Sequence, residues 1–332
     1  MKRQLWIPFL GLLIGGMAFF VGETGKDEQG FTLPGYHNAD AKFLGDHVIT
    51  SVDEGIQILD LSGNVVKQYE GLSASWLYPQ EADDGKVWVV AYSNHNMETH
   101  VLKLKASEDF SLLEDQKILT TDKLAIDPVL LHDGDQWYLT HTLIDGTINN
   151  PDPEGDNGVY TICLYRSEDL DKWEYVTDII SKKQNLEDGD LRTADGVLYY
   201  FFEMEQYDKG PSAICMMSSA DQGKTWSGPK ELLPPTADQE MASCEQTEEG
   251  WRLYLSSDQD SPGASYQGAS VYYADYTADF TPLGSLKRSS MPENQSVRLY
   301  EVKEIQGQLY FLFARNFLTD CDLLLRTIKQ EP

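Results

Sequence analysis

Gly250-Trp251-Arg252-Leu253-Tyr254 is one of five copies of a short phrase that decides the fold of this chain. In every copy, a turn with glycine or aspartate precedes a short apolar strand that is centred on an aromatic residue. The other copies are DGKVW at 84–88, GDQWY at 134–138, GVLY at 196–199 and GQLY at 307–310. The aligned aromatic residues lie 50, 61, 55 and 56 residues apart. A period of about fifty residues with several strands per unit predicts a β-propeller.

A sixth, less regular module precedes these five. GDHVIT at 45–50, GIQILD at 55–60 and GNVV at 63–66 predict three further short strands with turns between them. Because amphipathic helical stretches are missing after the N-terminal segment, the fold class is all-β. We therefore predict a six-bladed β-propeller over residues 31–328. Five blades are the alternative, because the first module could instead complete the last blade.

The charge balance excludes two classes of partner. The 332 residues include 54 acidic and 26 basic ones, which gives a formal net charge of −28. The acidic residues are spread along the chain and form no separate tail, so the negative field covers the whole surface. Nucleic acid and anionic membrane surfaces are therefore not expected as partners. We expect a monomer that binds carbohydrate, for the reasons given below.

The first thirty residues have the layout of an export signal. Lys2 and Arg3 precede an apolar run from Leu5 to Val21, and polar residues begin at Glu23. This pattern predicts a signal peptide or an uncleaved membrane anchor at residues 1–22, with a linker at 23–30. We therefore expect an extracytoplasmic protein, secreted or periplasmic, with possible membrane attachment through its N-terminus.

Two related turn motifs lie one module apart. Residues 219–226 read SADQGKTW, and residues 167–173 read SEDLDKW, with Leu170 in place of the glycine. Serine and aspartate side chains can accept hydrogen bonds from the backbone of a tight hairpin, glycine tolerates the positive φ of such a turn, and tryptophan packs between blades. Cys163 and Cys215 each lie four residues before the serine, so they predict small core residues at equivalent positions. Cys244 and Cys321 complete the four cysteines, whose spacing fits neither a zinc site nor a redox motif.

The first motif matches the S-x-D-x-G-x-T-W pattern, and here the chain resembles the sialidase and bacterial-neuraminidase-repeat families, in which this turn is called the Asp-box. The second motif resembles the form found in five-bladed glycosidases of the arabinanase and xylosidase type. In these families the motif is structural and lies away from the catalytic rim. The resemblance thus implies structural roles for the motif residues Ser219, Asp221, Gly223, Trp226, Ser167, Asp169 and Trp173.

Polar residues at one phase of the repeat are candidates for a functional site. Eleven residues before the aligned aromatic residues lie Asp127, Asp188 and Ser243. If each module begins with an inner strand and returns antiparallel, the ends of the return strands reach the same rim. The candidates that follow from this geometry for binding a substrate are Tyr78, His141, Asp190, Arg192, Glu240, Asp258, Arg298 and Arg315, and Glu203 is a further carboxylate at the end of a return strand.

Carboxylates from neighbouring blades suit glycoside hydrolysis. That reaction needs a general acid together with a nucleophile or base on opposite sides of the sugar. We predict Asp127 and Asp188 as the catalytic pair, with Glu203 as the next candidate acid. The phrase Asp127-Pro128 also resembles the opening of a blade in the five-bladed glycosidases, where the resemblance implies an aspartate that lines the sugar site. The alternative is that these carboxylates are solvated rim residues or turn caps.

The arginines limit the choice of substrate. Sialidases hold the substrate carboxylate with three arginines, whereas this chain has none between Arg3 and Arg166. An acidic protein also repels an anionic glycan. We therefore predict a glycoside hydrolase for a neutral or weakly charged glycan. Two alternatives stay open, namely a propeller that binds a glycan or protein without catalysis and a structural subunit of an envelope complex.

No cofactor or metal is expected from the residue patterns, with one exception that concerns calcium. The segment 145–157 is rich in Asp, Asn, Gly and Pro and predicts a rim loop. Its clustered oxygen atoms could bind calcium, although their spacing does not match the EF-hand loop.

Overall fold

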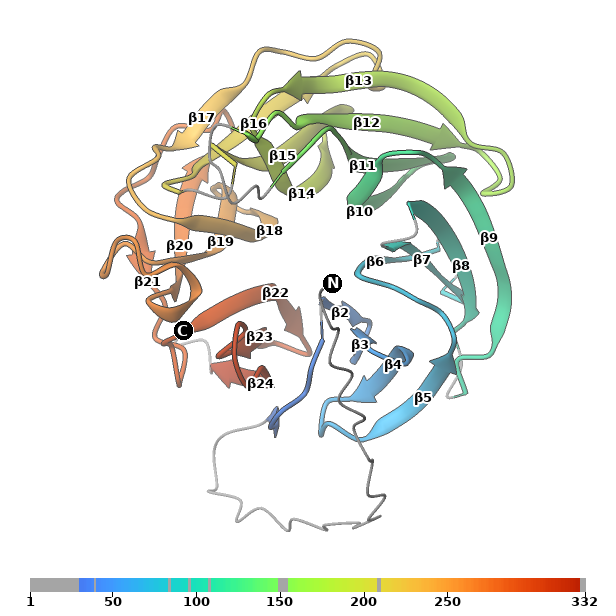
Figure 1. Ribbon diagram of the computed structural model, residues 1–332, viewed down its shortest axis with the longest axis horizontal. Helices are drawn as coiled ribbons and strands as arrows, with labels where there is room; N and C mark the ends of the chain where they lie inside the picture. The colour runs from blue at the N-terminus through green and yellow to red at the C-terminus, as the bar shows by residue number, and fades with distance from the viewer. Residues whose placement is uncertain are drawn as a thin grey trace, which may run out of the picture.

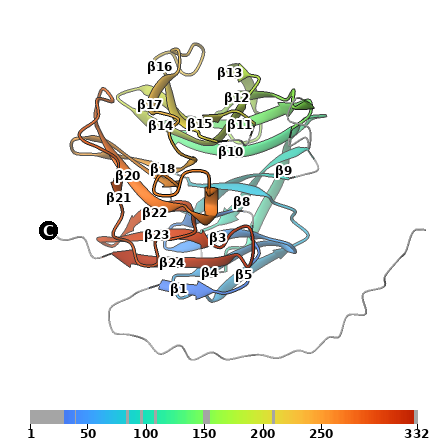
Figure 2. The same cartoon turned by 60° about the vertical axis from the view of Figure 1, so that its left-hand side comes forward.

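The computed structural model describes residues 30–38, 40–82, 85–94, 97–106, 109–148, 155–207 and 210–328. Their strands form six four-stranded antiparallel sheets that surround a central opening (Figures 1 and 2). The six-bladed propeller is confirmed, and the five-bladed alternative is excluded. The predicted signal or anchor lies outside the described residues, as do residues 149–154 of the segment proposed for calcium. Within the described ranges, no helix is long and apolar enough to cross a membrane.

Five blades are built from consecutive strands, and the first strand of each lies nearest the opening (Figure 1). Blade 1 contains β2 (Ala41–Leu44), β3 (His47–Val52), β4 (Gly55–Asp60) and β5 (Val65–Glu70), and blade 2 contains β6 (Trp76–Glu81), β7 (Val87–Asn94), β8 (Glu98–Lys105) and β9 (Leu112–Thr120). Blade 3 contains β10 (Leu124–Asp133), β11 (Gln136–Asp145), β12 (Val159–Ser167) and β13 (Glu174–Lys182). Blade 4 contains β14 (Asn185–Ala194), β15 (Val197–Glu205), β16 (Ala213–Ser219) and β17 (Lys230–Leu233). Blade 5 contains β18 (Gln239–Thr247), β19 (Gly250–Ser257), β20 (Ser270–Thr277) and β21 (Lys287–Arg288), with the short 3₁₀ helix η2 (Ser265–Gln267) between β19 and β20.

Blade 6 closes the ring by joining the two ends of the described chain. Its strands β22 (Val297–Ile305), β23 (Gln308–Arg315) and β24 (Asp322–Ile328) are completed on the outside by β1 (Gly30–Leu33) (Figure 2). The strand β1, which precedes the first module, therefore completes the last blade, and the first module forms a blade of its own. The prediction that the first module forms a blade is therefore confirmed, and the alternative that this module completes the last blade is wrong.

One arginine secures this closure. Arg326 on β24 donates from Nη1 to the carbonyl of Phe31 (2.6 Å) and from Nη2 to Thr32 Oγ1 (2.6 Å), both on β1. Nη2 also pairs with Glu293. Gly30 is required at the start of β1, because a Cβ atom there would lie 2.0 Å from the carbonyl oxygen of Leu325. The last blade is thus held by side-chain contacts in addition to the strand pairing.

The core lies between neighbouring blades, where their faces pack together. The aromatic residue of each repeated phrase belongs to a different apolar cluster between blades. Trp88, Tyr138, Tyr254 and Tyr310 are buried there, and Tyr199 is half-buried. Aromatic side chains bury a large apolar area each, so the five aligned residues supply five of the six interfaces with a packing anchor. The repeat therefore corresponds to the spacing of the blade interfaces.

The two serine–aspartate turns, 167–173 and 219–226, have equivalent hydrogen bonds. In the second turn, Gly223 N donates to Ser219 Oγ (2.9 Å), and Trp226 Nε1 donates to the carbonyl of Gly223 (3.0 Å). In the first turn, Leu170 N donates to Ser167 Oγ (2.9 Å) in the same way. The aspartate of each turn accepts further hydrogen bonds, and those from the hydroxyl and the backbone N–H of Thr225 lower the pKa of Asp221 to about 2. Both aspartates are thus occupied in holding the turn.

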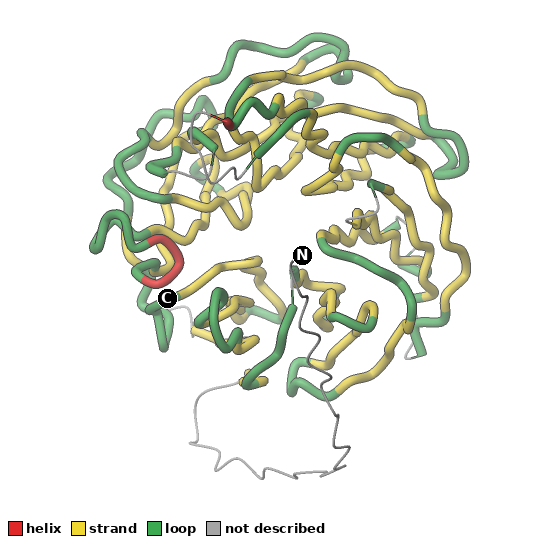
Figure 3. The backbone as a smooth tube through the Cα atoms, in the orientation of Figure 1, coloured by secondary structure: helices red, strands yellow, loops and turns green. Residues whose placement is uncertain are grey.

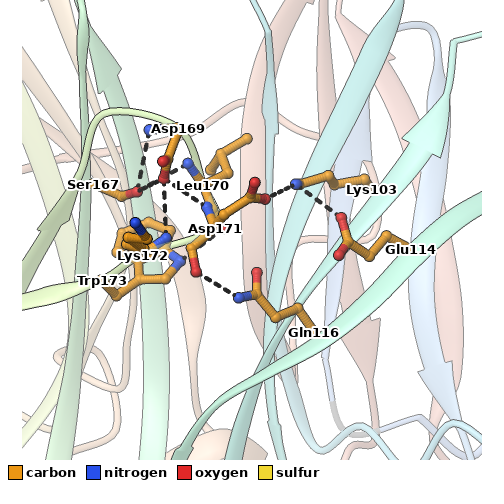
Figure 4. A network of polar contacts seen from close by, with 9 residues as sticks. All are labelled: Lys103, Glu114, Gln116, Ser167, Asp169, Leu170, Asp171, Lys172 and Trp173. Carbon is orange, nitrogen blue, oxygen red and sulfur yellow. Dashed lines mark hydrogen bonds and ion pairs between the residues drawn. The ribbon is translucent and has the colours of Figure 1, made fainter.

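Gly223 and Leu170 occupy corresponding places in the two turns, and each packs against the preceding blade. Gly223 has a φ of 82°, and a Cβ atom there would lie 2.2 Å from Leu164 Cδ2 of blade 3. Leu170 has a φ of 64° and is itself buried against blade 2. The turn of Leu170 is also tied to blade 2, because Lys103 Nζ contacts the carboxylate of Asp171 (2.7 Å) and Gln116 donates to its carbonyl (2.8 Å) (Figure 4).

The four cysteines are free thiols, and all are buried. Cys163 lies on β12 and Cys215 on β16, which are the third strands of blades 3 and 4. These two residues therefore occupy the small core positions that their spacing to the turn serines predicts.

The closure of the ring can be tested by removing its arginine. We expect Arg326→Ala to lower the free energy of unfolding by about 3 kcal/mol, because the buried guanidinium loses its hydrogen bonds to β1 and its contact with the exposed Glu293 together. Arg166→Ala is the matched control, since its ion pair with Glu174 is exposed and is worth about 0.5 kcal/mol or less. Urea unfolding followed by tryptophan fluorescence measures both. Equal losses in the two variants would contradict the role of Arg326.

Candidate active site at the start of the inner strands

Four inner strands are irregular near their beginning. The pairing of β10, β14, β18 and β22 with the next strand shifts between Ile126 and Val129, Glu187 and Asp190, Met241 and Ser243, and Leu299 and Glu301. A β-bulge turns a side chain away from the regular alternation of the strand. These four bulges lie at the same level of four adjacent blades, so they create one irregular ring at the rim where the inner strands begin.

Two of the bulges carry the predicted catalytic aspartates. Asp127 and Asp188 have φ values of 48° and 50°, a region that residues other than glycine seldom adopt and that is often found at functional sites. Asp188 N donates to Asp127 Oδ2 (3.1 Å), so the two residues are direct neighbours across blades 3 and 4. Gly189 leaves the space that this arrangement needs, because a Cβ atom there would lie 2.0 Å from Tyr200 Oη.

Both aspartates line one small cavity of about 40 Å³. Its walls come from the inner strands of blades 1 to 6, and the residues that line it with the two aspartates are Asp40, Lys42, Trp76, Leu77, Tyr78, Pro128, Val129, Gly189, Met241, Ala242 and Arg298. The structure therefore brings together side chains from positions 40 to 298 of the chain. Ser243, at the same repeat phase as the aspartates, instead accepts a hydrogen bond from Val302 N (3.4 Å) between blades 5 and 6.

Two glutamates extend the acidic cluster. Glu203 on β15 is only 5% exposed and shares a hydrogen bond with the carboxylate of Asp188. Glu240 on β18 accepts a hydrogen bond from Tyr266 Oη (2.6 Å) and lies 4.0 Å from Arg298 Nε. Asp127, Asp188, Glu203 and Glu240 are called the acid cluster below.

The acid cluster has unusual protonation equilibria. Burial raises the pKa of Asp127 to about 7, and the charge of Asp188 acts in the same direction. Burial, followed by repulsion from neighbouring carboxylates, raises the pKa of Glu203 and of Glu240 well above the usual range. Burial also raises the pKa of Asp188, but Arg298 and Lys42 oppose this shift. At neutral pH the cluster therefore contains protonated and ionised carboxyl groups side by side.

Arg298 is the cation closest to these acids. Its guanidinium lies over the ring of Phe317, with 4.4 Å from Cζ to the ring centroid, and also near the rings of Tyr300 (5.5 Å) and Tyr266 (5.8 Å). Aromatic faces hold a guanidinium in a fixed plane without removing its hydrogen-bond donors. Arg298 thus forms the boundary between the acid cluster and an aromatic surface on blades 5 and 6.

Sequence reasoning missed Asp40, which belongs to the same cavity. Asp40 directly precedes β2, and its Oδ2 accepts a hydrogen bond from Leu77 N of the next blade (3.0 Å). Counting eleven residues back from an aromatic residue could not find it, because β2 pairs with β3 without a bulge and the first module lacks the aromatic residue. Lys42, Trp76 and Tyr300 also lie outside the repeated phrase, so the repeat did not predict that they lie near the site.

Three predicted binding residues form a closed network deeper in the channel. Tyr78 Oη donates to Asp190 Oδ1 (2.9 Å), and Arg192 Nη2 pairs with Asp190 Oδ2 (2.9 Å). Cys244 N also donates to Asp190 Oδ2 (2.9 Å). The carboxylate of Asp190 is therefore occupied by its neighbours. Tyr78 borders the cavity of the acid cluster, whereas Arg192 lines a second cavity of about 300 Å³ with Tyr78 and Lys303.

His141, Asp258 and Arg315 do not join the acid cluster, and the expectation that they converge on it is not met. His141 is only 1% exposed, and its ring packs on Tyr165. The next residue, Thr142, faces blade 4 and donates to the carbonyl of Leu186, so His141 points to the opposite face of the sheet. Burial lowers the pKa of His141 to about 4, so it is neutral at ordinary pH. Arg315 pairs with Asp322 (3.0 Å).

Asp258 lies outside the acid cluster, and its carboxylate supports a loop. It is fully buried, and its Oδ2 accepts hydrogen bonds from Gly263 N (2.7 Å) and Ser265 N (3.0 Å). Its Oδ1 accepts one from Asp238 N (2.9 Å). Asp258 therefore holds the loop that leads into η2, which carries Tyr266.

One group of acids is close enough to share a metal ion. Carboxylate oxygens of Glu203, Glu205 and Asp238 lie within 4.8 Å of one another. Three carboxylates would suit a hard cation such as Ca²⁺. Protonation relieves the same repulsion, in accordance with the raised pKa of Glu203.

The sequence matches no protein-family model and no curated protein. Three solved structures have a similar fold. A β-1,2-mannobiose phosphorylase from Listeria innocua is 12% identical with a TM-score of 0.50, and the match covers 93% of this chain and 92% of that one. An α-L-arabinanase from Penicillium chrysogenum is 10% identical with a TM-score of 0.50, covering 76% and 92%. A protein of unknown function from Dyadobacter fermentans is 8% identical with a TM-score of 0.58, covering 85% and 82%.

At these identities the comparisons show the fold alone. Propellers of this shape include carbohydrate-active enzymes, of which the phosphorylase and the arabinanase are two. The similarity to sialidases, based on the turn at 219–226, is not established by these comparisons and stays a prediction.

The raised pKa of Asp127 predicts a stability that depends on pH. A carboxyl group whose pKa is higher in the folded state is protonated more readily there, so the folded protein loses stability as pH rises from about 4 to about 7. Asp127→Asn removes this loss. We expect the variant to gain on the order of 2–4 kcal/mol relative to the wild type between pH 4 and pH 8.

Thermal or urea unfolding at both pH values measures this difference. Asp135→Asn, in an exposed turn of blade 3, is the control and should show no such gain. A stability difference between Asp127→Asn and the wild type that is equal at pH 4 and pH 8 would contradict the burial of a charged Asp127.

Proposed function

We propose that this protein is a glycoside hydrolase that acts on a neutral or weakly charged glycan at the acid cluster. The observation that carries the proposal is the cluster itself, in which buried carboxyl groups from adjacent blades lie together and two of them, Asp127 and Asp188, line one cavity. Hydrolysis of a glycosidic bond requires such a pair, one to donate a proton and one to act as base or nucleophile.

The contacts suggest a role for each acid. Asp127, with a pKa of about 7, is the base or nucleophile, because it is ionised in part at neutral pH. Glu203 is the general acid, since its pKa lies well above the usual range and it keeps its proton. Asp188 bonds to both, through its N–H to Asp127 and through its carboxylate to Glu203, and therefore positions them.

The charges around the cavity support an uncharged substrate. Arg298 and Lys42 are the cations among its lining residues, and they face Asp40, Asp127 and Asp188 in the same cavity. A glycan carboxylate or sulfate would meet a surplus of negative charge there. Hydroxyl groups, in contrast, can donate to the carboxylates and accept from Arg298.

Two neighbouring structures support carbohydrate as the ligand class. One is a phosphorylase for β-1,2-mannobiose, and the other is an arabinanase complexed with arabinobiose. Because one of the two uses phosphate in place of water, assays need to be run with and without inorganic phosphate. Export from the cytoplasm is part of the proposal and rests on the N-terminal sequence pattern.

Single substitutions in the acid cluster should abolish turnover. We expect Asp127→Asn and Glu203→Gln each to lower kcat by roughly 10³-fold, since proton transfer by a positioned side chain contributes about 10²–10⁴-fold. The assay measures release of monosaccharide from β-1,2-mannobiose, arabinobiose and other neutral disaccharides, and fluoride release from the corresponding glycosyl fluorides.

Glu174→Gln provides the control, because this glutamate is exposed on the outer strand of blade 3. It should retain wild-type turnover. Turnover that persists in both Asp127→Asn and Glu203→Gln would exclude these roles. Binding of a disaccharide by the wild type without any cleavage would instead favour a non-catalytic glycan-binding propeller.

The pH profile of the reaction follows from the same equilibria. Because the base must be ionised, kcat/KM should rise as pH increases from 5 and reach half its maximum near pH 7, where Asp127 loses its proton. It should fall again at higher pH, when Glu203 is deprotonated. Initial rates from pH 4 to pH 10 test this prediction, and an optimum near pH 4 would contradict it.

A further inference from the structure

Another pocket, separate from the two cavities described above, opens beside the acid cluster on the loops of blades 5 and 6. It has a volume of about 260 Å³ and is lined by Tyr266, Gln267, Ser296, Asn316, Phe317, Leu318 and Thr319. Tyr266 belongs to η2, which Figure 3 shows in red beside the beginning of β22. Phe317 and Leu318 lie in the loop between β23 and β24. Both loops follow return strands, so they lie at the same rim as the acid cluster.

Two side chains connect this pocket directly to the acid cluster. Tyr266 Oη donates to Glu240 (2.6 Å), and the ring of Phe317 covers the guanidinium of Arg298 (4.4 Å). The two rings meet edge to face, with centroids 5.3 Å apart. The pocket and the cavity therefore share a wall, and a ligand that reaches Arg298 from the cavity would next meet these rings.

The lining suits a sugar ring. Ligand pockets combine apolar or aromatic surface with a few polar groups, and the rings of Tyr266 and Phe317 with Leu318 supply the apolar part. Leu318 is 61% exposed in spite of its apolar side chain. The side-chain amides of Gln267 and Asn316 also line the pocket and can bond to sugar hydroxyls, and the hydroxyls of Ser296 and Thr319, which donate to backbone carbonyls, can accept hydrogen bonds from them.

The loops that carry the pocket are held in place by hydrogen bonds. Asp258 accepts hydrogen bonds from Gly263 N and Ser265 N just before Tyr266. Ser296 Oγ donates to the carbonyl of Gln267 (2.8 Å), and Asn316 N donates to the carbonyl of Ser296 (3.1 Å). The two loops are thus bonded to each other through Ser296, and a preformed pocket loses less entropy on binding than a mobile one.

We propose that this pocket is a subsite for a second sugar residue, so that the substrate is a disaccharide or longer and runs from the acid cluster across Arg298 onto blades 5 and 6. The inference rests on the proposed function, whose substrate it specifies. The volume of the pocket is about 260 Å³, just below the range of about 300–1,000 Å³ for small-molecule pockets. This volume suits one monosaccharide residue.

The test compares two substrates in the full-length protein. One is the disaccharide of the panel above that is turned over fastest, and the other is the glycosyl fluoride of its monosaccharide, which is too short to reach the pocket. We expect Leu318→Ala and Phe317→Ala to lower the ratio of kcat/KM for the disaccharide to kcat/KM for the fluoride by roughly tenfold or more. Leu283→Ala, an exposed leucine in another loop of blade 5, should leave the ratio unchanged.

The outcomes separate this proposal from the proposed function. Equal losses on both substrates, or none on the disaccharide, would overturn the subsite and leave the hydrolase function standing. If the wild type binds a disaccharide without cleaving it, the hydrolase function fails, and weaker binding by Leu318→Ala in calorimetry still supports the subsite. A wild type that neither cleaves nor binds any disaccharide of the panel overturns both.

Discussion

The ring depends on carboxylates that cross from one blade to the next. An aspartate or glutamate at an inner strand accepts a hydrogen bond from a backbone N–H of the neighbouring inner strand. Each inner strand is the edge of its sheet, so this N–H has no partner within its own blade. A charge-assisted bond of this kind satisfies a buried donor and sets the relative height of two blades. The four pairs are Asp40 with Leu77, Asp127 with Asp188, Asp190 with Cys244, and Glu301 with Phe43. Four of the six blade junctions are held in this way.

This constraint also accounts for the chemistry of the site. Acids that bond to the inner backbone must lie in the low-dielectric centre of the ring, where burial raises the pKa of Asp40, Asp127 and Glu301. Asp127 uses one oxygen for Asp188 N and lines the cavity as well, so it is both a structural and a candidate catalytic group. Its substitution is therefore expected to change stability and activity together, and the two effects have different dependences on pH.

The side chains at the rim are held in place by a series of contacts. Asp258 and Ser296 hold the loops, the loops place Tyr266 and Phe317, and these rings in turn orient Glu240 and Arg298. Glu240 is reached by a tyrosine hydroxyl, and Arg298 is covered by a ring. Asp258, which was predicted to bind a substrate, holds the loop that carries Tyr266.

The sequence by itself determined the number of blades and most of their packing anchors, because an aromatic residue at a constant phase must repeat with the blade interface. It also placed Asp127, Asp188, Glu203, Glu240 and Arg298 at one rim, because equivalent positions in successive modules lie at the same level along the axis of a propeller. Only the tertiary structure decided which polar side chains meet. His141 and Arg315 lie near the ends of their return strands, as Glu203 does, but they face other neighbours, because strand alternation and bulges direct side chains within a blade. Asp40 joins the cavity from a module without a bulge, which no count along the chain could reveal.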